Sequence, residues 1–146
     1  MSEKIIATNK KAFHDYQILE NFEVGVKLIG PEVKSIKAGD MSLKESFVHI
    51  EQGELYIKNM HVGAYKPAKL VDYNPTRNRK LLANKKEISL LAAKLDQKGL
   101  SIIPTKVYLK NSFVKIEIAL AKGKKKWDKR EDLKKKDLMR EQRRSI

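Results

Sequence analysis

The strongest constraint on the fold is a pair of apolar runs near the end of the chain, separated by two turn residues. The first run is "LSIIPTKVYLK", the turn is "NS", and the second run is "FVKIEIALA". In the second run Lys115 and Glu117 alternate with Val114, Ile116 and Ile118, which is typical of a strand with one buried face. Two such runs on either side of a short turn predict an antiparallel β-hairpin.

Other segments extend this β-rich pattern. We expect one long strand over residues 16–28, a short helix or turn over residues 30–40, and a second hairpin over residues 46–62. A loop over residues 66–80 is expected to lead into an amphipathic helix over residues 79–98. The sequence therefore predicts a mainly β fold: a small OB-fold-like β-barrel of about six strands with flanking helices, followed by a basic C-terminal tail.

The net charge points to a polyanionic partner. The chain has 32 Lys and Arg against 18 Asp and Glu, a net charge of +14. Half of that excess lies in residues 122–146, which contain 12 basic and 5 acidic residues. Such a balance favours nucleic acid first and an anionic membrane second. Residues 1–121 are expected to form the barrel. Residues 122–146 lack an apolar stripe and are expected to be disordered when free and to fold on a partner.

Several kinds of chemistry are not indicated by the sequence. The chain has no cysteine, and its three histidines, at positions 14, 49 and 61, show no metal-ligand spacing. Neither a nucleophile motif nor a phosphate-binding glycine loop is present. We therefore expect no enzymatic activity, no metal and no cofactor. The absence of an apolar leader or a 20-residue apolar run favours a cytoplasmic protein without a membrane span.

Basic clusters supply candidate contacts with nucleic acid. Residues 9–11, 77–80 and 85–86 could lie on one face of the barrel, with Arg77 and Arg79 at the loop-to-helix junction directed toward phosphates. The alternative is an ordinary solvated surface. Of the adjacent Leu81 and Leu82, at least one is expected to pack in the core. Trp127 follows four lysines in five positions, so it favours stacking on a base; the alternative is a ring folded back onto the barrel.

Five stretches, in order from Asn9 to Asp132, together resemble the SsrA-binding protein (small protein B, SmpB) family, the bacterial partner of transfer-messenger RNA (tmRNA). They are "NKKAFHDY", "EVKSIKAG", "NPTRNRKLL", "VYLKNSFVKIEIALAKGKKK" and "WDKRED". The resemblance implies an OB-like barrel with an unstructured tail and no enzymatic activity. It implies binding of the tRNA-like domain of tmRNA and its delivery to stalled ribosomes, which is the ribosome rescue and peptide tagging of trans-translation.

The resemblance also implies the partners. These are tmRNA, elongation factor Tu (EF-Tu) within the aminoacylated RNA complex, and the ribosome at its A site, decoding region and mRNA channel, where the tail would become helical. We expect the protein to act as a monomer. Two alternatives rest on the residues alone: a generic basic OB-like ribosomal or nucleic-acid chaperone protein, and a small RNA-processing enzyme.

The family's functional positions carry over residue by residue. The implied RNA-binding residues are Asn9, Lys10, Lys11, His14, Glu23, Arg77, Arg79, Lys80, Leu82 and Lys115. The implied ribosome-binding residues of the tail are Lys122, Lys124, Lys125, Lys126, Trp127, Asp128, Lys129 and Arg130. Trp127 stands where the family usually has His or Tyr, which keeps an aromatic face and changes the hydrogen bonding.

Overall fold

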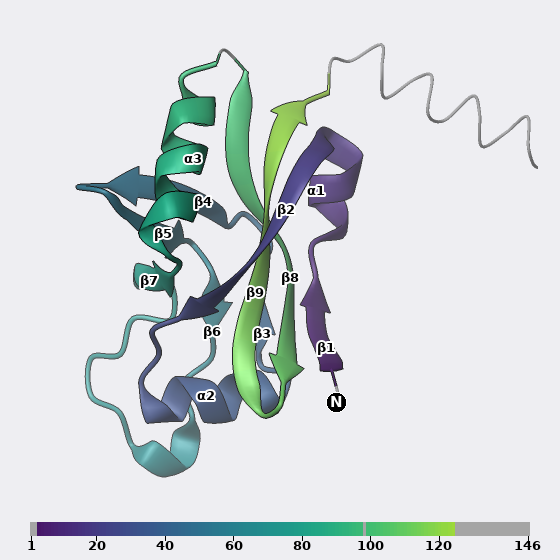
Figure 1. The fold of residues 1–146 in the computed structure, drawn as a ribbon. Helices are drawn as coiled ribbons and strands as arrows, with labels where there is room; N and C mark the ends of the chain where they lie inside the picture. Colours follow the sequence, from purple (N-terminus) through teal and green to yellow (C-terminus); the bar gives the residue numbers. More distant parts are fainter. Residues whose placement is uncertain (1–2, 98, 125–146) are drawn as a thin grey trace, which may run out of the picture.

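The computed structural model describes residues 3–97 and 99–124 (Figure 1). The elements are, in order, β1 (Glu3–Thr8), α1 (Lys10–Asp15), β2 (Tyr16–Val26), α2 (Gly30–Lys37), β3 (Met41–Ser42), β4 (Phe47–Glu51), β5 (Glu54–Lys58), β6 (His61–Val62), the 3-10 helix η1 (Lys66–Ala68), β7 (Arg79–Leu82), α3 (Lys85–Leu95), β8 (Leu100–Lys110) and β9 (Phe113–Gly123). No helix in these two ranges is long and apolar enough to cross a membrane.

Six strands close into a ring by antiparallel pairing. The order around the ring is β8, β4, β5, β7, β2 and β9, and β9 pairs again with β8. β1 adds to β8 as a further strand, and β3 pairs with β6 in a separate small sheet. The prediction of a mainly β fold with about six strands and flanking helices is therefore confirmed.

The β8–β9 hairpin is the longest pairing predicted from the sequence, and it is confirmed (Figure 1). Ile116 and Ile118 are fully buried. Lys115 and Glu117, which alternate with them, therefore lie on the outer surface of the ring. The long strand over residues 16–28 and the hairpin over residues 46–62 are also confirmed, as β2 and as β4 with β5. The core is filled by apolar side chains from the ring, α2 and α3, among them Val24, Ile36, Leu55, Ile57, Leu81, Ile88, Leu91, Ile116 and Ile118.

The helix predicted over residues 79–98 was wrong at its start. Residues 79–82 form the strand β7, which pairs with β5 and β2 and closes the ring between them. α3 begins only at Lys85, where the Asn84 side chain accepts a hydrogen bond from the N–H of Glu87 (2.8 Å). Strand pairing on both sides outweighs the helical spacing of Leu81 with the residues that follow. Leu81 is fully buried and Leu82 is exposed, which confirms that one of the two packs in the core.

β1 and α1 were not predicted. Asn9 joins them to β8: its backbone N–H donates to the carbonyl of Thr105 (2.8 Å), and its side-chain amide donates to the carbonyl of Pro104 (3.0 Å). The side-chain oxygen of Asn9 also accepts from the N–H of Ala12 (3.2 Å), which caps α1. A six-residue helix is too short to show a helical pattern in the sequence. Its position depends on a strand almost 100 residues further along the chain.

β9 extends beyond the domain boundary that the sequence suggested after residue 121. Lys122 pairs with Gln17 of β2 and Leu100 of β8, so it belongs to the ring. The N–H of Lys124 donates to the carbonyl of Asp15 (2.9 Å). The remaining tail residues of the prediction, 125–146, lie outside the described residues, and the division into a folded part and a tail stays a prediction.

The β8–β9 turn offers a direct stability test. Asn111 and Ser112 both have positive φ, 50° and 71°. Glycine adopts this region without steric cost because it has no Cβ. Asn tolerates it through local hydrogen bonds of its side chain, whereas the Cβ of Ser112 is strained there. We expect Ser112→Gly to raise the free energy of unfolding by about 0.5–1 kcal/mol in urea denaturation. The control is Ser89→Gly within α3, which should lower it by a similar amount. Equal stability of Ser112→Gly and the wild type would mean that this turn carries no strain.

Candidate nucleic-acid interface

The candidate interface lies on the outside of four neighbouring strands, β1, β8, β9 and β2, and we call it the outer face. Register defines its centre: Lys115 of β9 lies opposite Tyr108 of β8 on one side and Gly25 of β2 on the other. Two residues further along β9, Glu117 lies opposite Glu23 of β2. Residues opposite each other in adjacent strands project to the same side of a sheet. These side chains therefore share one surface.

Glu23 organises the polar groups at the centre of the outer face. The Tyr108 hydroxyl donates to Glu23 Oε2, and Lys110 Nζ lies 3.4 Å from Glu23 Oε1. The hydrogen bond from Tyr108 and the Lys110 ammonium hold the pKa of Glu23 below its ordinary value, while burial opposes them. Burial and the Glu23 carboxylate raise the pKa of Tyr108. Glu23 is consequently an ionised acceptor, held in place beside Lys110 and Lys115.

Tyr108 is packed under these charges. Its ring is almost fully buried, and Lys106 Nζ lies 5.4 Å from the ring centroid, within the range of a cation–π contact. Next to it, the buried Thr105 hydroxyl donates to Glu117 Oε2 (2.5 Å). The interlocked side chains give the outer face a fixed pattern of charges. A rigid pattern costs little ordering entropy when a partner binds.

β7 brings an apolar side chain to the same surface. Leu82 is 53% exposed and lies opposite Gly25, which in turn lies opposite Lys115. A Cβ added at Gly25 would lie only 3.3 Å from the Leu82 Cβ, so glycine makes room for this leucine. Lys80 projects outward, two residues before Leu82, and forms an ion pair with Glu54 (3.5 Å). The predicted residues Glu23, Lys80, Leu82 and Lys115 are thus on the outer surface of three adjacent strands.

α1 covers one end of the outer face. Ala12 packs against Ala119 and Ala121, which follow Lys115 and Glu117 at two-residue spacing in β9. Figure 1 shows α1 beside the start of β2 and the end of β9. The predicted residues Lys10, Lys11 and His14 are exposed on this helix. Lys11 is paired with Glu45 (3.0 Å), and His14 Nδ1 lies 2.9 Å from Asp15 Oδ1.

A cleft of about 530 Å³ adjoins α1 on the side of β4. It is lined by Lys11 and Glu45, which form the ion pair, and by aromatic residues of β2 and β4, Tyr16 and Phe47. Asn9 also lines it, although the side-chain amide and oxygen of Asn9 are engaged in capping α1 and in binding β8. Asn9 thus positions α1, and with it the exposed side chains of Lys10 and Lys11.

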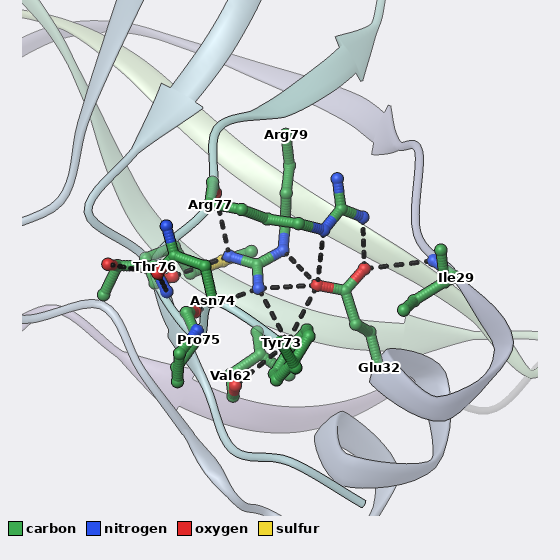
Figure 2. A network of polar contacts seen from close by, with 10 residues as sticks. Ile29, Glu32, Val62, Tyr73, Asn74, Pro75, Thr76, Arg77 and Arg79 are labelled. Atoms are coloured by element: carbon green, nitrogen blue, oxygen red, sulfur yellow. Dashed lines mark hydrogen bonds and ion pairs between the residues drawn. The ribbon is translucent and has the colours of Figure 1, made fainter. Parts of the chain in front are cut away.

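The structure contradicts the outward orientation expected for Arg79. Its side chain is 0% exposed, because it alternates with Lys80 on β7 and points into the molecule with Leu81. Arg79 Nε donates to Glu32 Oε2 (2.6 Å) and Arg79 Nη1 to the carbonyl of Met60 (2.7 Å). Figure 2 shows the guanidinium enclosed by its partners. A side chain in this position cannot touch a phosphate.

Arg77 is bound to the same carboxylate. Its Nε donates to Glu32 Oε2 (3.1 Å) and its Nη2 to Glu32 Oε1 (Figure 2). The Tyr73 hydroxyl also donates to Glu32 Oε2 (3.0 Å) and accepts from Arg79 Nη2 (3.0 Å). Glu32, on α2, thereby ties together α2, the segment 73–77 and β7. Arg77 and Arg79 are structural residues here, and Arg77 is only partly exposed.

Glu32 was not singled out by the sequence. Its position in the first turn of α2, directly after Pro31, was a signal for helix capping, and its carboxylate does accept from the N–H of Ile29 (3.0 Å). Burial alone would raise the pKa of Glu32, but hydrogen bonds from Arg77, Ile29 and Arg79 and the charge of Arg79 lower it to about 2. The carboxylate is therefore ionised, and no buried polar side-chain atom in the described part of the chain lacks a partner.

The described residues contain no group of three or more His, Cys, Asp or Glu side chains that could hold a metal ion. Of the predicted tail residues, Lys122 lies in β9 and Lys124 follows it, whereas Lys125, Lys126, Trp127, Asp128, Lys129 and Arg130 lie outside the described residues.

Comparison with known proteins decides the family. The family model described as "SmpB protein" matches residues 6–146. The chain belongs to the SmpB family. It is 57% identical to the SsrA-binding protein of Sulfurihydrogenibium sp. (strain YO3AOP1) over 141 residues, 97% of this chain and 93% of the relative. It is 51% identical to the SsrA-binding protein of Bacillus subtilis (strain 168), over 96% of this chain and 90% of the relative.

A solved structure has the same fold. It is described as "tmRNA-SmpB: a journey to the center of the bacterial ribosome", and it matches with a TM-score of 0.68 and 41% sequence identity, covering 82% of this chain and 85% of the other. The family resemblance in the sequence is therefore confirmed over nearly the whole length of the chain.

Proposed function

We propose that this SmpB-family protein binds the tRNA-like domain of tmRNA through its outer face and delivers it to stalled ribosomes for rescue and peptide tagging. The names of its relatives, SsrA-binding proteins, and the ribosomal context of the matching structure support this. The observation that carries the proposal is geometric. Residues distant in the sequence, Lys10 and Lys11 of α1, Glu23 of β2, Leu82 of β7 and Lys115 of β9, lie along one outer surface.

Each group on this surface has a role that its chemistry supports. The lysines of α1 and β9 neutralise phosphates, which positions the RNA without reading its bases. Glu23, fixed by Tyr108, accepts a hydrogen bond from a base or a ribose 2′-hydroxyl, which a phosphate-binding cation cannot do. Leu82 supplies an apolar contact on the same surface. Arg79 and Glu32 act indirectly, by holding β7 in the ring.

The wider role follows the family. The protein acts as a monomer without enzymatic activity, in the cytoplasm where its ribosomal partner is found, and enters the A site with tmRNA and EF-Tu. The tail, disordered when free, becomes a helix in the mRNA channel. Its cations meet ribosomal RNA there, and Trp127 stacks near the decoding region. These statements rest on family membership and on the charge of residues 125–146.

The alternative function is that of a generic basic RNA chaperone, which the net charge of +14 would equally support. The test is competition binding of the full-length protein to the tRNA-like domain of tmRNA against an elongator tRNA at physiological salt, where non-specific contacts weaken. Preference for the tRNA-like domain supports the proposal. Equal affinity for both RNAs would favour the generic chaperone.

Lys115 provides a sharper prediction. We expect Lys115→Gln to weaken binding to the tRNA-like domain and to reduce the slope of log affinity against log salt by about 0.7–0.9, the loss of one phosphate contact. The matched control is Lys37→Gln at the exposed end of α2, which should change neither quantity. A slope unchanged in Lys115→Gln would remove this lysine from the interface.

A further inference from the structure

Phe113 is an exposed aromatic residue at the hairpin end of the outer face. It is the first residue of β9 and is 71% exposed. It precedes Lys115 by two residues in a regular strand, so its ring projects to the same side as Lys115. Register places Phe113 opposite Lys110, the lysine that also approaches Glu23. The ring therefore continues the surface already described.

The surroundings of the ring combine apolar and cationic groups. Ile5 of β1 is 59% exposed and lies opposite Tyr108, so it belongs to the same end of the outer face. Lys110 lies opposite Phe113 on β8, and Lys115 is two residues further along β9. A flat ring flanked by cations on a sheet is the arrangement that proteins use to stack a nucleobase while neutralising the adjoining phosphates. Two acidic groups lie near the same lysine: Glu23, which accepts from Tyr108 and Lys110, and Glu3 of β1, which lies opposite Lys110.

The hairpin presents the ring in a fixed place. Only two residues, Asn111 and Ser112, connect β8 and β9, and the pairing of Lys110 with Phe113 closes the turn directly. A Phe side chain has two rotatable bonds, so little entropy is lost when it is ordered by a partner. The ring is thus held at a fixed point of the hairpin with 71% of its surface exposed.

We propose that Phe113 stacks on an unpaired base of the bound RNA and extends the interface from Lys115 to the end of the β8–β9 hairpin. The base must be unpaired, because duplex RNA hides the faces of its bases within the helix. This inference rests on the proposed function. It adds a contact that reads an exposed base face, whereas the lysines around it read only phosphates.

The first test is Phe113→Ala in the full-length protein. Loss of one stacked base predicts an affinity for the tRNA-like domain of tmRNA that is about 5- to 100-fold lower. The salt dependence should stay that of the wild type, because no charge is removed. Phe113→Tyr should retain the wild-type affinity. The matched control is Leu90→Ala, which removes a 42% exposed apolar side chain of α3, away from the outer face, and should have no effect.

A second measurement observes the site directly. In the variant Phe113→Trp with Trp127→Phe, the only indole of the protein lies at position 113. Stacking predicts saturable quenching of its fluorescence by the tRNA-like domain, with the same midpoint as direct binding. An indole exposed to water throughout the titration would overturn the proposal.

The outcomes separate this inference from the proposed function. If Phe113→Ala binds like the wild type while Lys115→Gln binds weakly, the stacking proposal fails and the interface stands. If Phe113→Ala binds RNA normally but lowers peptide tagging, the ring faces a ribosomal component, and stacking on tmRNA is excluded. If the wild type does not prefer the tRNA-like domain over elongator tRNA, the proposed function itself fails.

Discussion

Glu32→Gln is expected to lower the free energy of unfolding by about 3–5 kcal/mol, because it leaves the buried Arg79 and the partly exposed Arg77 without their counter-ion. Arg79 is fully buried, and its Nε and Nη2 both lie 2.6 Å from Glu32 Oε2. Gln keeps the shape of the side chain and one carbonyl acceptor, but it removes the negative charge. The guanidinium of Arg79 cannot reach water without moving β7, so the cost is not relieved by solvation.

Urea denaturation of the full-length protein measures this loss. The control is Glu45→Gln, which breaks the exposed ion pair with Lys11 and should cost less than about 1 kcal/mol. A loss of the same small size in Glu32→Gln would show that water reaches the arginines and that the network contributes little to stability.

The same carboxylate makes stability depend on pH in a defined direction. The pKa of Glu32 is lowered to about 2 in the folded protein, from an ordinary value of 4.5. A depressed pKa contributes stability above pH 4.5, and this contribution is lost as the pH falls toward 2. At about 1.4 kcal/mol per pKa unit, the contribution is about 3 kcal/mol. The stability difference between the wild type and Glu32→Gln should therefore shrink between pH 5 and pH 2, which urea midpoints at several pH values would measure.

A chain ending at Lys124 is expected to bind the tRNA-like domain of tmRNA within about threefold of the wild type at physiological salt and to lose peptide tagging completely. The truncation removes residues 125–146, which contain ten basic and five acidic residues and Trp127. It leaves every described helix and strand intact. The cut must follow Lys124, because Lys122 pairs with two strands and Lys124 is bonded to Asp15. A cut after residue 121 would remove the end of β9. A loss of tagging could then come from a folding defect as well as from the missing tail.

Tagging is measured in a reconstituted translation system that is stalled on a message without a stop codon, and RNA affinity is measured on the same preparations. Trp127→Ala in the full-length chain is the companion variant, since it removes the aromatic face and retains all the cations. We expect it to reduce tagging by about 5- to 100-fold, the loss of one stacked base. Wild-type tagging by the chain ending at Lys124 would refute the role proposed for the tail.

Some elements of this fold are encoded by neighbouring residues, and others depend on pairing with distant strands. β8, β9, β2 and the β4–β5 hairpin were predicted because alternation and turn residues are carried by neighbouring positions. β1 and α1 were missed, since a short strand and a six-residue helix have too few residues to show a period. The residues of the outer face came from the family resemblance. Their alternation showed only that Lys115 and Glu117 share a side of one strand.

The sequence by itself determined the strands β2, β4, β5, β8 and β9. It also determined that the chain is strongly basic and that its motifs belong to one RNA-binding family. Only the tertiary structure decided the position of Arg79, which composition and motif placed on the RNA surface. Its partner Glu32 lies 47 residues away and Met60 lies 19 residues away, so no local pattern contains them. A buried arginine needs a counter-ion and several acceptors at once, and these meet only when β5 and β2 enclose β7 and α2 closes over the loop. Burial is a property of the assembled ring, and it turned a predicted RNA contact into part of the core.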